Sequence, residues 1–177
     1  MNEALTLEII ENRHLAPEQY AEILALGTRA FEEDFAPFLK NLTGATHVLG
    51  RYDGKLVSHA AWITRWLQTG SYAALRTAYV EAVATEPAYE RRGFASTVMR
   101  RLQECITDFE LAALAPAEKN FYARLGWELW RGPLYIRSVD GLLAMPDEEV
   151  MILKLPSTPP LDLEAALSAE WREGELW

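Results

Sequence analysis

The order of strands and helices predicted from the sequence favours an α/β fold, with a mixed central sheet and helices on both faces. Apolar runs joined by hairpin turns dominate the first half of the chain, which favours antiparallel strands. In the second half, segments with helical periodicity separate the apolar runs, as in βα units with parallel strands. Half of the 177 residues are apolar, which is enough for one domain over residues 1–177 to bury a core.

The first half is predicted to contain one helix among several strands. Pro17 opens a helix that runs to about Phe31, because proline is favoured at the first helical position and apolar residues follow at helical spacing. Asp53 and Gly54 separate two apolar runs, a pattern typical of a tight hairpin. The predicted strands are residues 5–11, 46–52, 55–67 and 73–84.

The second half is predicted to alternate between helices and short strands. Apolar residues recur at helical spacing from Phe94 to Phe109, and a second helix should begin at Pro116 and end at Gly126. Residues 141–147 are expected to form a turn. The predicted strands are residues 111–114, pieces of 127–136, residues 150–155 and one last strand in the C-terminal segment 156–177.

Composition narrows the classes of partner. The net charge of −9 argues against nucleic acid, because phosphate contacts need a basic surface; it would attract a cationic substrate or simply keep the protein soluble. No apolar run reaches the roughly 18 residues of a membrane span, and residues 1–4 lack the features of a secretory signal, so we expect a cytoplasmic protein. The histidines His14, His47 and His59 are widely spaced and lack zinc-ligand spacing, so no metal site is expected. Cys105 lies on the apolar face of its helix and is expected to be a packed thiol rather than a nucleophile.

A basic glycine turn between a strand and a helix is the most informative segment of the chain. Arg91, Arg92 and Gly93 follow the strand-like residues 79–84 and precede the helix that begins at Phe94. Free backbone N–H groups and the positive end of the helix dipole meet there, and such a point binds phosphate. The turn lacks both the phosphate-loop pattern and the three spaced glycines of a dinucleotide site. The sequence therefore predicts an anion site for a nucleotide or coenzyme.

Two segments resemble the GCN5-related N-acetyltransferases (GNAT). Residues 90–95 (Glu-Arg-Arg-Gly-Phe-Ala) resemble the family's pyrophosphate loop, Gln/Arg-x-x-Gly-x-Gly/Ala, and residues 120–127 resemble its helix and the start of the strand that follows. Glu90 stands where the family has Gln or Arg, and we expect its carboxylate to point away from a pyrophosphate. The resemblance implies the GNAT fold, an acyltransferase activity and acetyl-CoA as the co-substrate, without a metal.

The resemblance also implies how acetyl-CoA is bound. Backbone groups that follow a bulge in strand 79–84 would bind the pantetheine arm, and an N–H near Val83 would polarise the thioester carbonyl. The glycine turn would bind the pyrophosphate through its backbone and through Arg91 or Arg92. The implied coenzyme-binding residues are Val83, Ala84, Thr85, Arg91, Arg92, Gly93, Phe94, Ala95 and Ser96.

Glu81 and Tyr122 are candidates for proton transfer. Glu81 is a lone carboxylate in an apolar strand, where charge is costly, and such a group suits a general base. The resemblance implies that it takes a proton from the substrate amine through water; a strand-edge glutamate that faces solvent is the alternative. The resemblance implies that Tyr122 protonates the departing coenzyme thiolate; a half-buried core tyrosine is the alternative.

A narrower resemblance, from residue 31 to the C-terminus, is to the aminoglycoside 2′-N-acetyltransferases. It is carried by residues 31–35, 79–84, 122–130, 132–133, 146–149 and the ending Glu-Trp-Arg-Glu-Gly-Glu-Leu-Trp at 170–177. It implies acetylation of the 2′-amine of an antibiotic, resistance, and a homodimer. Converging anions would suit a polycationic sugar; the alternative for each acid alone is a solvated surface charge. The implied substrate-binding residues are Asp34, Glu81, Asp147, Glu148 and the C-terminal Trp177.

Departures from the narrower pattern leave other acceptors open. Residues 43–47 replace the family's Gly-Gly-Met-His segment, and Ala115, Pro116 and Ala117 stand where it has serines, in a slightly shorter loop. The alternatives are another amine, such as an aminosugar antibiotic of the kasugamycin type, a polyamine or a peptide amine, or a non-catalytic module that binds acetyl-CoA or an antibiotic.

Overall fold

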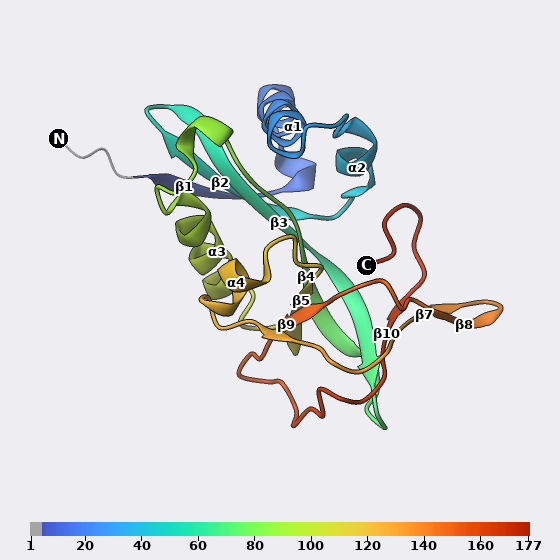
Figure 1. Ribbon diagram of the computed structural model, residues 1–177. Coiled ribbons are helices and arrows are strands. Elements are labelled where there is room, and N and C mark those ends of the chain that lie inside the picture. Colours follow the sequence, from blue (N-terminus) through green and yellow to red (C-terminus); the bar gives the residue numbers. More distant parts are fainter. Residues whose placement is uncertain (1–4) are drawn as a thin grey trace. The chain divides into compact units, whose positions relative to one another are not determined.

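The computed structural model describes residues 5–177 (Figure 1). These residues divide into two compact units. Unit 1 comprises the described chain up to Ile63 together with Val80–Cys105, and unit 2 comprises Thr64–Tyr79 and Ile106–Trp177. Two long strands, β3 (Lys55–Thr69) and β4 (Leu75–Thr85), contribute residues to both. Each unit is described by itself.

Unit 1 consists of a small antiparallel sheet and the helices that cover it. Besides β3 and β4, its elements are β1 (Thr6–Glu11), η1 (Asn12–His14), α1 (Pro17–Phe31), α2 (Ala36–Asn41), β2 (Thr46–Tyr52), η2 (Pro87–Tyr89) and α3 (Phe94–Cys105). Strand β2 pairs antiparallel with both β1 and β3. The tight turn predicted at Asp53 and Gly54 is confirmed, because both residues have left-handed φ angles, 51° and 70°, as a two-residue hairpin requires.

Helices pack on both faces of the sheet in unit 1. Neighbouring strand residues point to opposite faces. Leu49 on β2 belongs to a buried cluster that includes Ile23 of α1 and Leu39 of α2. A Cβ atom on Gly50 would lie 2.9 Å from the Cγ2 atom of Val98 in α3, so α3 packs closely against the other face. Helices on both faces were predicted, and in unit 1 this is confirmed.

Unit 2 is a mixed sheet built from short strands. Besides its parts of β3 and β4, its elements are β5 (Leu111–Leu114), α4 (Lys119–Ala123), β6 (Glu128–Leu129), β7 (Leu134–Ser138), β8 (Gly141–Ala144), β9 (Met151–Leu153) and β10 (Leu167–Glu170). The strand order is β6-β9-β5-β4-β3-β10-β7-β8. Strands β4 and β5 are parallel, as are β10 and β7, whereas the pairs β3–β10, β5–β9, β6–β9 and β7–β8 are antiparallel.

Three elements differ from the sequence prediction. The turn predicted at residues 141–147 was wrong in part, because Gly141–Ala144 forms β8 and pairs with β7; all four residues are exposed, so no alternation marks them as a strand. The helix predicted from Pro116 begins later, at Lys119. Helix α2 was not predicted, since it has only six residues and contains a proline.

Gly132 shows how tightly the last segment of unit 2 packs. A Cβ atom at this position would lie 1.9 Å from the backbone oxygen of Ala165, so no other residue fits without a shift of the backbone. The N–H groups of Arg131 and Gly132 both donate to the oxygen of Leu163 at 2.9 Å. These contacts lead the chain into β10, the last strand predicted within 156–177 and confirmed there.

Candidate active site

A backbone distortion in β4 separates Glu81 from Val83. The residue between them, Ala82, has a φ of 54°, a left-handed conformation that is uncommon for alanine. Such a residue within a strand acts as a bulge does: it bends the strand and redirects the neighbouring groups. The distortion lies immediately before Val83 and Ala84, where a bulge was predicted. Glu81 is buried in unit 1, with 8% of its surface exposed, so the solvent-facing alternative for this glutamate is excluded in this structure.

Two buried histidines connect to the distorted residue. His59 Nδ1 lies 2.8 Å from the carbonyl oxygen of Ala82, and His59 Nε2 lies 2.9 Å from His47 Nδ1. His47 Nε2 in turn lies 3.1 Å from Oδ1 of Asn12. Burial lowers the pKa of His47 to about 4, and burial together with the nearby His47 lowers the pKa of His59 to about 3. Both rings are therefore neutral near pH 7.

Sequence reasoning missed the histidine pair because the register of β2 and β3 shifts by one residue between Gly50 and Arg51. Continued without the shift, the pairing at the turn would place His59 on the opposite face of the sheet from His47. After the shift, His47 pairs with Ala61 and Leu49 pairs with His59. Residues two apart on a strand share a face, so the register places both imidazoles on the same face of the sheet, one strand apart. In the sequence the two histidines lie twelve residues apart, which does not match the usual spacing of zinc ligands.

The basic glycine turn joins directly onto the first turn of α3. Arg91 and Gly93 have φ angles of 60° and 82°, and both the N–H and the hydroxyl of Thr97 donate to the oxygen of Gly93, at 3.0 and 3.1 Å. Alternating left-handed residues before a helix direct consecutive N–H groups to one point, which favours anions. All nine residues implied in coenzyme binding belong to unit 1.

Arg92 is held by aromatic rings beside this turn. Its guanidinium carbon lies 4.5 Å from the ring centroid of Tyr52, 4.9 Å from that of Phe94 and 5.2 Å from that of Tyr89. Cation–π contacts of this kind hold the guanidinium in place. Arg92 thus contributes fixed positive charge next to the turn, while Glu90 is exposed.

Tyr122 is buried in unit 2, on α4. Only 7% of its surface is exposed, and its ring lies edge-on to Phe121 and Trp127, with centroids 4.9 and 6.3 Å away. Burial raises the pKa of Tyr122 to about 12, so the phenol keeps its proton at physiological pH. A protonated phenol can donate a proton but cannot act as a base, which fits the role implied for it.

The residues implied in acceptor binding have different environments in the two units. In unit 1, Asp34 is exposed, and its Oδ1 accepts a hydrogen bond of 3.0 Å from the N–H of Ala36 at the start of α2. In unit 2, Asp147 and Glu148 are exposed in the connection between β8 and β9, whereas Trp177 is buried. Asp34 therefore supports the start of α2 through one of its oxygens.

A buried arginine holds the C-terminal segment of unit 2. The guanidinium of Arg65 donates to the oxygens of Leu176 and Glu170, both at 2.7 Å. Its carbon also lies 4.9 Å from the ring centroid of Tyr79 and 5.9 Å from that of Trp177. Arg65 is 1% exposed, so it ties the last residues to the sheet. Sequence analysis did not single it out, because the two oxygens to which it donates lie more than a hundred residues later.

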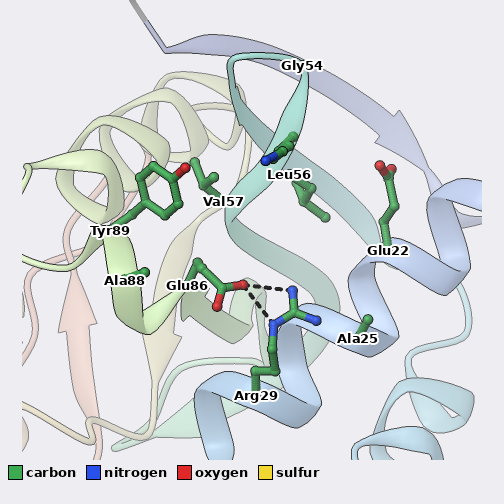
Figure 2. A pocket seen from close by; sticks show the side chains of 10 residues that line it. Glu22, Ala25, Arg29, Gly54, Leu56, Val57, Glu86, Ala88 and Tyr89 are labelled. Atoms are coloured by element: carbon green, nitrogen blue, oxygen red, sulfur yellow. Dashed lines mark hydrogen bonds and ion pairs between the residues drawn. The ribbon is translucent and has the colours of Figure 1, made fainter.

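A cavity of about 390 Å³ lies in unit 1 among α1, the start of β3 and η2 (Figure 2). Figure 2 shows Arg29 of α1 directed toward Glu86, and their charged atoms lie 2.7 Å apart. A second cavity, of about 430 Å³, has Trp62 and Cys105 among its lining residues. Neither is lined by a residue predicted to act in catalysis, coenzyme binding or acceptor binding.

Among the described residues 5–177, no group of three or more histidine, cysteine, aspartate or glutamate side chains could hold a metal ion. No helix in the same range is long and apolar enough to cross a membrane.

Residues 11–130 match the acetyltransferase (GNAT) domain family. The chain belongs to this family. An aminoglycoside 2′-N-acetyltransferase from Mycolicibacterium fortuitum is similar to it over a longer range. That relative is 28% identical to this chain over 180 aligned residues, which cover 97% of this chain and 92% of the relative.

Solved structures confirm the GNAT fold. The GNAT family N-acetyltransferase YhbS from Escherichia coli, solved in complex with CoA, superposes with a TM-score of 0.67 at 18% identity, covering 98% of this chain and 93% of that one. A probable N-acyltransferase from Enterococcus faecalis superposes with a TM-score of 0.56 at 20% identity, covering 70% of this chain. The matched part spans about a third of that second protein (32%).

Proposed function

We propose that this GNAT protein is an acetyl-CoA-dependent N-acetyltransferase whose acceptor is the 2′-amine of an aminoglycoside antibiotic, and that it confers resistance. One observation carries the choice of acceptor. The similarity to an aminoglycoside 2′-N-acetyltransferase extends over 97% of the chain, well beyond residues 11–130 of the family match. The shared region thus includes the segment with Asp147 and Glu148.

The donor is supported by two backbone features of unit 1. The left-handed Ala82 precedes the N–H of Val83, which is the predicted partner of the thioester oxygen. The turn at Arg91 and Gly93 presents N–H groups and fixed arginine charge, which suit a pyrophosphate. A relative with the same fold, YhbS, was solved with CoA, which supports the same class of donor here.

In the proposed reaction, each proton has a stated destination. Glu81 takes a proton from the ammonium group through water, and the free amine attacks the thioester carbonyl carbon. The new N–C bond leaves an oxyanion, which the Val83 N–H stabilises. The C–S bond then breaks, Tyr122 donates its proton to the sulfur, and the second proton on the attacking nitrogen passes to water. The products are an acetamide and free CoA.

A second acceptor class is favoured by the loop that follows β5. Ala115 and Ala117 are exposed and carry no hydroxyl where the aminoglycoside enzymes have serines. Loss of those contacts would suit a different amine: another aminosugar antibiotic such as kasugamycin, a polyamine or a peptide amine. A non-catalytic module that binds acetyl-CoA or an antibiotic is the remaining alternative.

The decisive experiment measures CoA release by the purified protein with matched acceptors. Kanamycin B carries a 2′-amine and kanamycin A a 2′-hydroxyl at the same position. We expect turnover with kanamycin B, little with kanamycin A, and an acetyl group mapped by NMR to N2′. Turnover only with kasugamycin, spermidine or a peptide would select the second class. Binding of CoA without turnover on any acceptor would reject an enzyme. The homodimer that we also propose is checked by analytical ultracentrifugation.

A further inference from the structure

We propose that His59, supported by His47 and Asn12, is a positioning residue that aims the Val83 N–H by holding the peptide between Ala82 and Val83. The inference rests on the proposed function, because it assumes that the Val83 N–H and Glu81 act in acetyl transfer. All of these residues belong to unit 1.

The carbonyl of Ala82 decides the direction of the three hydrogen bonds that connect Asn12, His47, His59 and Ala82. The oxygen of Ala82 can only accept, so His59 Nδ1, at 2.8 Å, carries a hydrogen. In the neutral ring His59 Nε2 is then bare, and it accepts from His47 Nδ1 at 2.9 Å. In neutral His47 the Nε2 is bare in its turn, and it needs a donor. This requires the side-chain amide of Asn12 to be turned so that its NH₂ group, and not Oδ1, faces His47 Nε2.

The held carbonyl and the catalytic N–H belong to the same rigid group. A peptide bond is planar and trans, so the C=O of Ala82 and the N–H of Val83 point in opposite directions. Fixing the oxygen toward His59 consequently fixes the direction of the Val83 N–H. Glu81 lies on the other side of Ala82, so rotation at this residue would also move the proposed base.

The distortion at Ala82 needs such support. A left-handed alanine is strained, and strained residues persist where their surroundings hold them. A bulge leaves a carbonyl outside the regular strand ladder, and a buried carbonyl without a donor is unfavourable. Ala82 is buried in the cluster beneath α1 and α2, where solvent cannot supply that donor. The pKa values of both histidines are far below 7, which keeps the tautomers defined under assay conditions.

The test compares two substitutions of His59 with a matched control. His59→Phe keeps a ring but removes the donor, and we expect kcat to fall about tenfold with little change in the KM for acetyl-CoA. His59→Asn keeps an N–H near the Nδ1 position and should restore most of kcat. Thr77→Val is the control: it removes a buried side-chain hydrogen bond to a backbone carbonyl, that of Leu75 in β4, and should leave kcat within about twofold.

An NMR measurement tests the same inference without catalysis. Nitrogen-15 spectra of the wild type at pH 7 should show His59 and His47 both neutral and both protonated on Nδ1. An Nε2-protonated His59 would overturn the proposal, even if His59→Phe failed to fold. So would a folded His59→Phe with wild-type kcat. A wild type that turns over no amine, with the tautomers as assigned, would instead reject the proposed function and leave the hydrogen-bond chain intact.

Discussion

Unit 1 and unit 2 hold their candidate functional groups in different ways. In unit 1 the candidate donor-binding groups are mainly backbone N–H and C=O groups, set by left-handed residues at Ala82, Arg91 and Gly93, with Glu81 beside them as the candidate base. In unit 2 they are side chains, of which Tyr122 and Trp177 are buried and Asp147 and Glu148 exposed. Backbone N–H groups can bind the pyrophosphate and thioester that all acetyl-CoA donors share. Exposed side chains can be substituted at little cost to the fold. The comparison explains why the family and its donor are easier to infer than the acceptor.

The largest effect is expected from removing the buried arginine of unit 2. Arg65→Met leaves the oxygens of Leu176 and Glu170 without their donor, and we expect the free energy of unfolding to fall by about 3–5 kcal/mol. Urea denaturation measures it. Hydrogen exchange should show lost protection in β10 and retained protection in the β2–β3 hairpin. Arg131→Ala, which removes an exposed ion pair with Glu164, is the control; an equal loss there would refute a special role for Arg65.

Acid should destabilise unit 1 through the histidine pair. Because the pKa values of His47 and His59 are lowered by burial, their contribution is fully present above about pH 6.5, the value of an unfolded histidine, and is lost as pH falls toward about 4 and 3. Each should add about 1.4 kcal/mol per pH unit to the slope of stability against pH, or about 3 kcal/mol for the pair between pH 6.5 and 5.

Urea titrations at each pH measure this slope, and His59→Asn should reduce it by about half. An unchanged slope in that variant would show that the histidines are already protonated in the folded protein or titrate outside this window.

Glu81→Gln tests the proposed base of unit 1. The substitution keeps size and hydrogen bonding but cannot take a proton, so we expect kcat/KM to fall about a hundredfold. The affinity for CoA, measured by calorimetry, should stay unchanged. Activity close to that of the wild type would remove Glu81 from the mechanism and leave it a structural role.

Tyr122→Phe tests the proposed acid of unit 2. Water can replace the phenol as proton donor to a thiolate, which is a good leaving group, so the expected loss in kcat is only about tenfold. With the high pKa of Tyr122, the wild type should lose activity only at strongly alkaline pH. A variant that retains full kcat but is less stable would assign Tyr122 to the core instead.

The smallest effect is expected at the turn of unit 1. Glu90→Gln introduces the residue that is usual in the family and removes a negative charge beside the proposed pyrophosphate site. Because Glu90 is exposed and solvent screens its charge, we expect the KM for acetyl-CoA to fall by about two- to threefold, with kcat unchanged. Steady-state kinetics at two salt concentrations measure it. A rise in KM would mean that Glu90 helps to shape the turn.

Local signals predicted the fold well where they were strong. Pro17 begins α1, the hairpin turn lies at Asp53 and Gly54, and β5 has the predicted bounds Leu111–Leu114. In each case a nearby residue or a continuous apolar run carries the information. Strand β8 was missed because its residues are exposed and only pairing with β7 makes it a strand.

The candidate site could be predicted only in part, for a related reason. Glu81, Tyr122 and the glycine turn are recognisable from short patterns. The residues that hold these groups in place are not recognisable in this way. His59 on β3 contacts Ala82 on the neighbouring strand β4, and Arg65 donates to oxygens more than a hundred residues away. Such partners become visible only when strand register is known, because register decides which side chains share a face.

The pairing of β10 has a consequence for the order of folding. Ser168 of β10 lies opposite Gln68 of β3, 100 residues away in the chain, whereas the β2–β3 hairpin closes over two residues. Distant pairings carry a large loop-closure entropy and form late. We therefore expect pulsed hydrogen exchange during refolding to label β10 after the hairpin is already protected. Early protection of β10 would contradict this order.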